Sequence, residues 1–175
     1  VMTALAYYRL YRIDREAEDI QTSSIPGLYY STALQEAWSN DILLTEQHVL
    51  QTEPAVQRAI EEKLRKGRDE LNALVEKHKR SRLTQDKDSP LEGFVAARAV
   101  YTRLQDDILA TAKDPGRRAQ TLDRIKSDLI PQFALGLGGL APLVEWSRAS
   151  AEAPADRIAA DVMSTRLASL TILGI

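Results

Sequence analysis

The sequence contains no cysteine and only two histidines among its 175 residues. Without cysteine there can be no disulfide, no thiolate zinc site and no thiol catalysis, and the chain suits the cytoplasm and the periplasm equally. With His48 and His78 alone, a histidine-rich metal site is not expected. Aromatic residues make up only 6% of the chain, so a core must form mainly from aliphatic side chains.

A strong charge of one sign and long apolar runs are also missing. The formal net charge is −2, which creates no general attraction for nucleic acid or an anionic membrane. A membrane span needs about 20 apolar residues, and the apolar runs at the two ends, "VMTALAYY" and "RLASLTILGI", are shorter than this. Both ends nevertheless look like the edges of membrane-spanning helices, with ordinary apolar helix ends as the alternative. No signal peptide is recognisable.

Apolar residues recur at helical spacing along most of the chain. Hydrophobic residues make up 44% and charged residues 27%, a balance that suits a soluble domain with its own core. Steps of three and four residues keep side chains on one helix face, and alternating strand patterns are almost absent. The pattern predicts an all-α chain folded as a single domain over residues 1–175. The expected core seams are Tyr30-Leu34-Ala37-Asp41-Leu44-His48, Ile60-Leu64-Gly67-Leu71-Leu74-His78, Phe94-Ala97-Tyr101-Leu104-Ile108-Thr111 and Leu122-Ile125-Leu129.

Residues that start and end helices divide the chain into four predicted helices. Thr52 before Pro54 suits a helix start, Ser89 before Pro90 suits another, and Asp114 precedes a Pro-Gly turn. The predicted helices cover residues 3–51, 54–82, 89–112 and 116–173. Because the connections are short, consecutive helices run antiparallel. The prediction is an up-down-up-down four-helix bundle with long first and last helices, whose surplus segments, 3–23 and 146–173, project together from one end.

Two stretches interrupt the long predicted helices. Pro26-Gly27 lies within the first helix, where we expect a kinked but continuous helix with Ser24 as an N-cap, and a true loop is the alternative. The last helix contains "GLGGLAP" at residues 136–142. This run follows no strand and lacks the Lys-Ser/Thr of a phosphate loop. Its glycines are therefore expected to permit a kink or the close approach of another helix.

No catalytic constellation is present in the sequence. There is no Gly-x-Ser-x-Gly, no His-Glu-x-x-His and no phosphate-binding loop, and no Glu-x-x-His pair that could hold a metal inside a helical bundle. The adjacent carboxylates Glu61-Glu62 and Asp106-Asp107 point in different directions on a helix. We therefore expect no enzyme activity, no cofactor and no metal site.

Polar residues on the predicted seams are candidates for ligand binding. Asp41 and His48 interrupt the first seam, with Trp38 and Thr45 nearby, and Tyr101 lies on the third seam. A polar group on a buried stripe is costly unless it is paired. These residues therefore suit either a ligand pocket or paired positions in the core.

A second candidate group lies in the first turns of the last helix. It comprises Arg117, Arg118, Thr121 and Arg124. Arginine binds carboxylates through two parallel hydrogen bonds, and the helix N-terminus adds partial positive charge. The group predicts a site for a small organic anion, in which Trp38 and Thr45 would supply a stacking face and a hydroxyl. Exposed surface arginines are the alternative.

Three segments together resemble the extracytoplasmic four-helix-bundle sensor domain of methyl-accepting chemotaxis proteins. The segment "YRLYRIDREAEDIQTSSIPGLYYSTALQEA" is similar to that family's first helix, with its midway Ile-Pro. The segment "FVAARAVYTRLQDDILATAKDPGRRAQTLDRIKSDLIP" looks like its third helix, turn and fourth helix, and "LVEWSRASAEAPADRIAADVMSTRLASL" like its descent to the membrane. Some sensor histidine kinases carry a similar module.

The resemblance implies where the domain would lie and how it would act. The chain would begin just after one transmembrane helix and end as it enters a second, so the domain would be the periplasmic part of an inner-membrane protein. Such domains form homodimers through helices 1 and 4, with a small ligand in the half of the bundle far from the membrane. Signalling would be a small displacement of the last helix, a two-state element that the ligand biases.

The sequence departs from the amino-acid-sensing members of the family, which use arginines on the first helix. Residues 24–51 contain neither Lys nor Arg, and this leaves organic acids bound from the last helix, aromatic compounds bound against Trp38 or tyrosines, or a partner protein. Because of the arginines at residues 117–124, we expect a small organic anion, an aromatic or dicarboxylic acid. Two other functions stay open: the sensor domain of a transmembrane histidine kinase, and a helical interaction domain with no ligand. Flanking sequence would separate them, because each output module has its own signature.

Overall fold

The computed structural model describes residues 2–80 and 91–173, and the described part is helical apart from two short connections. No strand occurs in these residues, which confirms the all-α prediction. The helices are long and pack antiparallel in a bundle-like arrangement. In chain order the elements are α1 (Met2–Asp19), the π-helical turn η1 (Ile20–Ser24), α2 (Ile25–Leu50), α3 (Pro54–Arg80), α4 (Leu91–Thr111), the 3-10 turn η3 (Pro115–Arg117), α5 (Arg118–Arg124), the π-helical turn η4 (Ile125–Leu129) and α6 (Ile130–Leu173).

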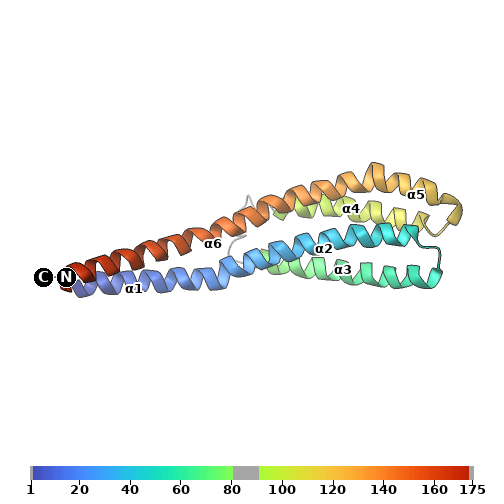
Figure 1. The fold of residues 1–175 in the computed structure, drawn as a ribbon. Coiled ribbons are helices and arrows are strands. Elements are labelled where there is room, and N and C mark those ends of the chain that lie inside the picture. The colour runs from blue at the N-terminus through green and yellow to red at the C-terminus, as the bar shows by residue number, and fades with distance from the viewer. Residues whose placement is uncertain (1, 81–90, 174–175) are drawn as a thin grey trace.

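The helices associate in pairs, as Figure 1 shows. α2 packs on α3, α4 packs on α6, and α2 also packs on α6. The connections after α2 and α4 lie at one end of the molecule, while α1 and the second half of α6 extend together past the other end of α3 and α4. The predicted surplus segments therefore do project as a pair. The predicted loop at 82–89, with its Ser89 cap, lies outside the described residues.

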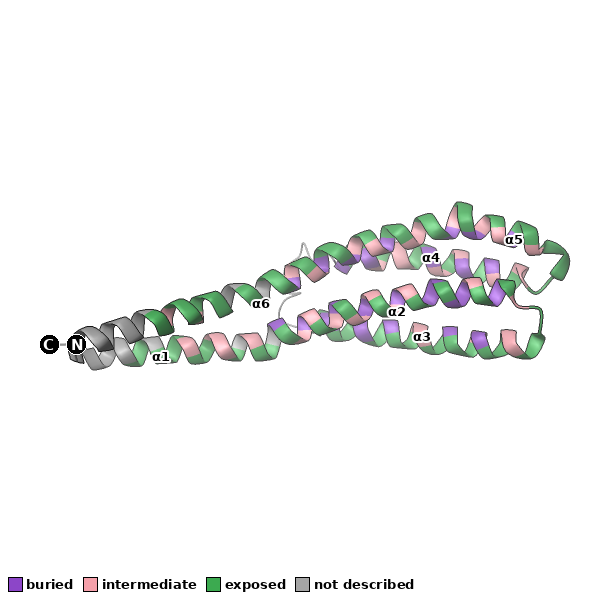
Figure 2. Ribbon diagram, in the orientation of Figure 1, coloured by how far each residue is buried: buried purple, intermediate pink, exposed green. Residues whose placement is uncertain are grey.

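The core is aliphatic and has one aromatic cluster. Trp38 lies with its ring centroid 4.4 Å from that of Tyr101, 5.3 Å from that of Phe94 and 5.6 Å from that of Phe133. The predicted seams are largely confirmed, although several of their members are only partly buried: Tyr30, Ala37, Leu104 and Leu122. The buried aliphatic side chains include Leu34, Leu64, Leu71, Leu74, Ile108, Ile125, Leu129, Leu140 and Leu143. Figure 2 shows the buried residues on the inner faces of the bundle, whereas the α1–α6 pair is mostly exposed where it is described.

The helix at Pro26-Gly27 is continuous, as predicted, but Ser24 is not its N-cap. Ser24 is itself helical, with φ −71° and ψ −48°, and its side chain makes no capping hydrogen bond. A proline inside a helix loses the bond to the carbonyl four residues earlier, and for Pro26 that carbonyl belongs to Thr22, inside η1. Pro131 likewise lacks the bond to the carbonyl of Ser127, which lies inside η4. A wider π turn therefore accommodates each of these two prolines, whereas α6 continues through Pro142 and Pro154 without one.

The glycines of α6 allow other helices to approach closely, as the sequence predicted. A Cβ added at Gly139 would lie 2.9 Å from the backbone nitrogen of Phe94 on α4. A Cβ at Gly136 would lie 2.8 Å from the Trp38 ring, whereas a Cβ at Gly138 would meet nothing within 4 Å. Gly139 is therefore the point where the α4 and α6 backbones come nearest to contact.

One described helical run, Pro115–Ala149, is long and apolar enough to cross a membrane when judged by length and composition alone. The core helix of a soluble bundle passes the same test, so this is weak evidence for a span. The run supplies Ile125, Leu129, Leu140 and Leu143 to the core. Only 22% of its most apolar window is buried, so much of its apolar surface faces outward.

Replacing Gly139 with alanine should destabilise the domain by about 1–3 kcal/mol, because the new methyl group would collide with backbone rather than with a movable side chain. The matched change Gly138→Ala, one residue earlier, should be neutral or stabilise by up to about 1 kcal/mol, since alanine favours the helix. Urea unfolding followed by circular dichroism measures both. Equal stabilities for the two variants would contradict the close approach of α4 and α6.

Candidate functional site

A layer of polar side chains crosses the apolar core and joins three helices. The amide nitrogen of Gln105 on α4 donates to Asp41 Oδ2 at 2.6 Å and to Thr45 Oγ1 at 2.7 Å, both on α2. The amide oxygen of Gln105 accepts from Arg68 on α3, at 2.6 Å from Nη2 and 3.2 Å from Nε. Gln105 is 1% exposed and Asp41 is 4% exposed. These four residues, together with Tyr101, are called the polar layer below.

Burial dominates the electrostatics of the polar layer. Desolvation raises the pKa of Asp41, and the neighbouring Tyr101, the hydrogen bond from Gln105 and the charges of Arg68 and Arg98 oppose this rise without cancelling it. The pKa of Tyr101 is also raised, first by burial and then by the nearby Asp41 charge. The layer therefore contains a carboxyl group that binds its proton more tightly than a solvated aspartate does.

The structure brings three of the predicted site residues together, since Asp41, Thr45 and Tyr101 all belong to the polar layer. Trp38 lies in the aromatic cluster, and its Nε1 donates to the Phe133 carbonyl at 3.1 Å. Its polar group is therefore satisfied within the core, as is usual for buried tryptophan.

His48 is fully buried and pairs with Glu61, whose Oε1 lies 3.1 Å from its Nε2. Glu61 also lies 3.6 Å from Lys113 Nζ. His48 therefore ties α2 to the first turns of α3, away from the hydrogen bonds of the polar layer.

The predicted arginines lie at the far end of the bundle and make local contacts. Arg117 is exposed, and Arg118 donates to the Gln51 carbonyl at 3.0 Å, at the end of α2. Arg124 pairs with Asp107 at 2.7 Å and with Asp128 at 3.5 Å. Thr121 is buried and donates to the Arg117 carbonyl at 2.9 Å. Arg118 and Arg124 therefore hold α5 against its neighbours, and the cations near Asp41 are Arg68 and Arg98 instead.

Sequence reasoning missed Gln105, Arg68 and Arg98. The sequence contained a signal for two of them. Phe94, Tyr101 and Ile108 recur every seven residues on one face of their helix. Arg98 follows Phe94 by four residues, and Gln105 follows Tyr101 by four residues. Such alternation of four and three residues describes one helix face. Arg68 follows the glycine of the second seam and had no comparable signal.

Two of the surface grooves outside the core are opposite in charge and are the candidate ligand sites compared below, while a smaller groove of about 300 Å³ is lined in part by Lys77 and Arg80. The first has a volume of about 670 Å³, lies mainly along α2, and includes Glu36 and Glu70 but no cation in its lining. The second has a volume of about 560 Å³ and lies between α3 and α4. Its charged lining residues are Arg68, Glu76, Lys79, Arg98 and Arg103. Of the two grooves compared, only the second would attract an anion, and the described residues contain no cluster of acidic or histidine side chains that could hold a metal ion.

Replacing Asp41 with asparagine should reduce the pH dependence of stability. Folding raises the pKa of Asp41, so protonation of this carboxyl stabilises the folded state. This contribution to the free energy of unfolding is fully present below the unfolded pKa of about 3.9, and it is lost as the pH rises through the folded pKa. The free energy of unfolding of the native chain should therefore fall relative to that of Asp41→Asn as the pH rises from about 4. Urea unfolding across a pH series measures the difference.

The control for this experiment is Asp123→Asn, which removes an exposed carboxyl from α5. It should leave the pH dependence as in the native chain. If Asp41→Asn behaves in the same way as this control, the buried carboxyl is not linked to folding.

No protein-family model matches the chain, and no curated protein matches it in sequence at a significant level.

Proposed function

We propose that this chain is the extracytoplasmic sensor domain of a transmembrane chemoreceptor, which binds a small organic anion and passes a conformational signal through α6. The observation that supports the proposal most is the helical pair formed by α1 and the second half of α6. This pair places both ends of the chain side by side (Figure 1). Two adjacent helices leaving one end of a domain suit a receptor whose chain crosses the membrane on either side of its sensor.

The pair is held together by charges as well as by packing. Arg12 on α1 pairs with Asp161 on α6, and Arg157 on α6 lies 3.9 Å from Glu16 on α1. α6 is a single helix of 44 residues, about 65 Å long at 1.5 Å per residue. It contributes Leu140 and Leu143 to the bundle core and then continues into the pair. A shift of its first half would therefore be carried along a rigid element to the far end.

In this proposal the domain is an up-down-up-down four-helix bundle of the chemoreceptor sensor type. α1, η1 and α2 together form the long first helix, and α5, η4 and α6 form the long last helix. α3 and α4 are the shorter middle helices. The same helical pair would serve the sensor of a transmembrane histidine kinase equally well, so that function is the second candidate.

We also propose that the domain works as a homodimer through its first and last helices. Four large apolar side chains on the outer face of α2 are exposed: Ile25, Tyr29, Leu43 and Leu50. Steps of four, fourteen and seven residues place them on one stripe of coiled-coil type, in which the exposed Glu36 lies between Tyr29 and Leu43. On the last helix, Ile130 and Leu135 are exposed as well. A second copy of the chain would cover this apolar surface, with the flanking membrane helices raising its effective concentration.

Crosslinking in the membrane-bound receptor tests the dimer. A single cysteine introduced as Leu43→Cys should form a disulfide between protomers, because the chain has no other cysteine and position 43 lies on the exposed stripe. The matched control Ala73→Cys, at an exposed position on α3, should not crosslink. The reverse pattern would place the interface on α3 and reject the proposed dimer. Crosslinked product is quantified on non-reducing gels.

A hybrid receptor tests the sensor function. The domain would replace the sensor of a chemoreceptor whose kinase output is measurable, and a set of organic acids, amines and neutral sugars would be added. An organic acid should change kinase activity. Inserting four glycines after Ala159, which interrupts the continuous α6 with residues that disfavour helix, should abolish that response while the chain still binds the acid. A response to amines or sugars alone would reject the anion class. A response that survives the glycine insertion would reject signalling through α6.

A further inference from the structure

The groove between α3 and α4 has the dimensions of a small-molecule site. α3 packs mainly on α2 and α4 mainly on α6, so the facing sides of α3 and α4 leave a groove of about 560 Å³. Ligand sites commonly have volumes of about 300–1,000 Å³. The groove is lined by one face of each helix, since its residues recur in steps of three, four and seven.

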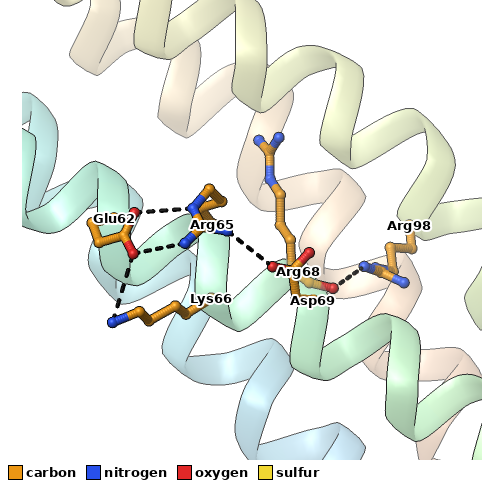
Figure 3. A network of polar contacts seen from close by, with 6 residues as sticks. All are labelled: Glu62, Arg65, Lys66, Arg68, Asp69 and Arg98. Carbon is orange, nitrogen blue, oxygen red and sulfur yellow. Dashed lines mark hydrogen bonds and ion pairs between the residues drawn. The ribbon is translucent and has the colours of Figure 1, made fainter.

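Arg98 makes one hydrogen bond to a backbone carbonyl in this groove and no ion pair among the described residues. Its Nη2 donates to the Arg68 carbonyl at 3.2 Å, and no carboxylate lies within ion-pair distance of it among the described residues. Figure 3 shows Arg98 reaching across to α3 at the level of Arg68. A guanidinium carries five N–H donors, so most of the donors of Arg98 remain available. Its partial burial, which lowers its pKa, makes an incoming carboxylate more favourable than at a solvated arginine.

The other cations differ in how far they are already engaged. Arg68 is bound to Gln105 and lies 2.5 Å from Asp106, and Lys79 lies 3.5 Å from Glu76. Arg103 donates to the Ala99 carbonyl of its own helix at 3.2 Å and has no ion pair among the described residues. Arg98 and Arg103 therefore supply the free positive charge of the groove.

The lining between these cations is partly apolar, with Asn72 and Thr102 as neutral polar residues and Glu76 as its one acidic residue. Val75 is buried on α3, Val95 is partly buried on α4, and Ala99 is exposed beside them. A ligand that fits both features carries a carboxylate for the arginines and a compact apolar body for the floor. Inorganic anions would satisfy the charges but leave the apolar lining uncovered.

We propose that the α3–α4 groove binds a small carboxylate with an apolar body, and that Arg98 holds the carboxylate with Arg103 in support. The anion of the proposed sensor would then bind in the groove rather than at the arginines of α5. The binding site itself does not depend on the proposed function; only the statement that binding produces a signal rests on it. The acidic groove along α2 does not compete for such a ligand, since Glu36 and Glu70 would repel it.

Calorimetry on the 175-residue chain with benzoate as the probe tests the site, with benzamide as a neutral molecule of the same shape. Benzoate should bind, and benzamide and inorganic phosphate should bind at least about tenfold more weakly, because each lacks one of the two features. If phosphate binds as tightly as benzoate, or if benzamide does, the proposed ligand class is wrong. If benzoate does not bind, the site is wrong.

Variants then locate the bound probe. Arg98→Gln should weaken benzoate binding at least about tenfold, and the matched control Arg117→Gln, at an exposed arginine on the distal turn, should not. Ala99→Phe keeps every charge and fills the groove from an exposed position, so it should also abolish benzoate binding. This second variant keeps the test valid if Arg98→Gln proves unstable. If Arg117→Gln weakens binding and the two groove variants do not, the anion binds at the distal turn and the groove proposal falls.

The two proposals fail in different ways. Binding in the groove without any kinase response in the hybrid receptor would reject the sensor function and leave the groove site intact. A kinase response to benzoate that Ala99→Phe leaves unchanged would reject the groove and leave the sensor function intact.

Discussion

The buried amide of Gln105 is the interaction on which the alignment of the helices depends. Aliphatic seams allow helices to slide by a turn at little cost, but an amide that must satisfy Asp41 and Thr45 on one side and Arg68 on the other has one position in which all its bonds form. A slip by one turn would leave a buried carboxylate and a buried amide unpaired, which is expensive in a medium of low polarity. The polar layer thus fixes the relative height of α2, α3 and α4.

Much of the fold, and little of the site, could be predicted from the sequence. Helical spacing and the breaks near Pro54 and Pro115 define elements that the structure contains, because these signals depend on local backbone chemistry. The partners of Asp41 could not be predicted, since they come from helices 27 and 64 residues away and depend on helix rotation. The prediction that Ser24 is an N-cap was wrong for a related reason. Serine is a common N-cap residue, but here the π turn η1 runs directly into α2, so no new helix starts at Ser24.

The two long helices carry the same local feature at different levels of the bundle. In each, a π turn precedes a proline, η1 before Pro26 and η4 before Pro131. A π turn replaces the regular hydrogen-bond pattern with a longer one, so it marks a place where a helix can change its local winding without breaking. η1 lies where the first helix leaves the bundle, whereas η4 directly follows α5, near the opposite end (Figure 1). Only η1 is therefore positioned to absorb a small shift between the bundle and its helical pair.

α4 lines the α3–α4 groove on one side and packs closely against α6 on another. Val95 and Arg98 line the groove, while the adjacent Phe94 backbone lies where a Cβ on Gly139 of α6 would be only 2.9 Å away. α4 cannot move toward α6 without a backbone collision, or away from it without opening the core at Phe94. Under the sensor proposal, a ligand that shifts α4 would therefore shift α6 as well. Because α6 continues as one helix into the pair with α1, such a shift would reach the far end of the domain as a displacement of the helix.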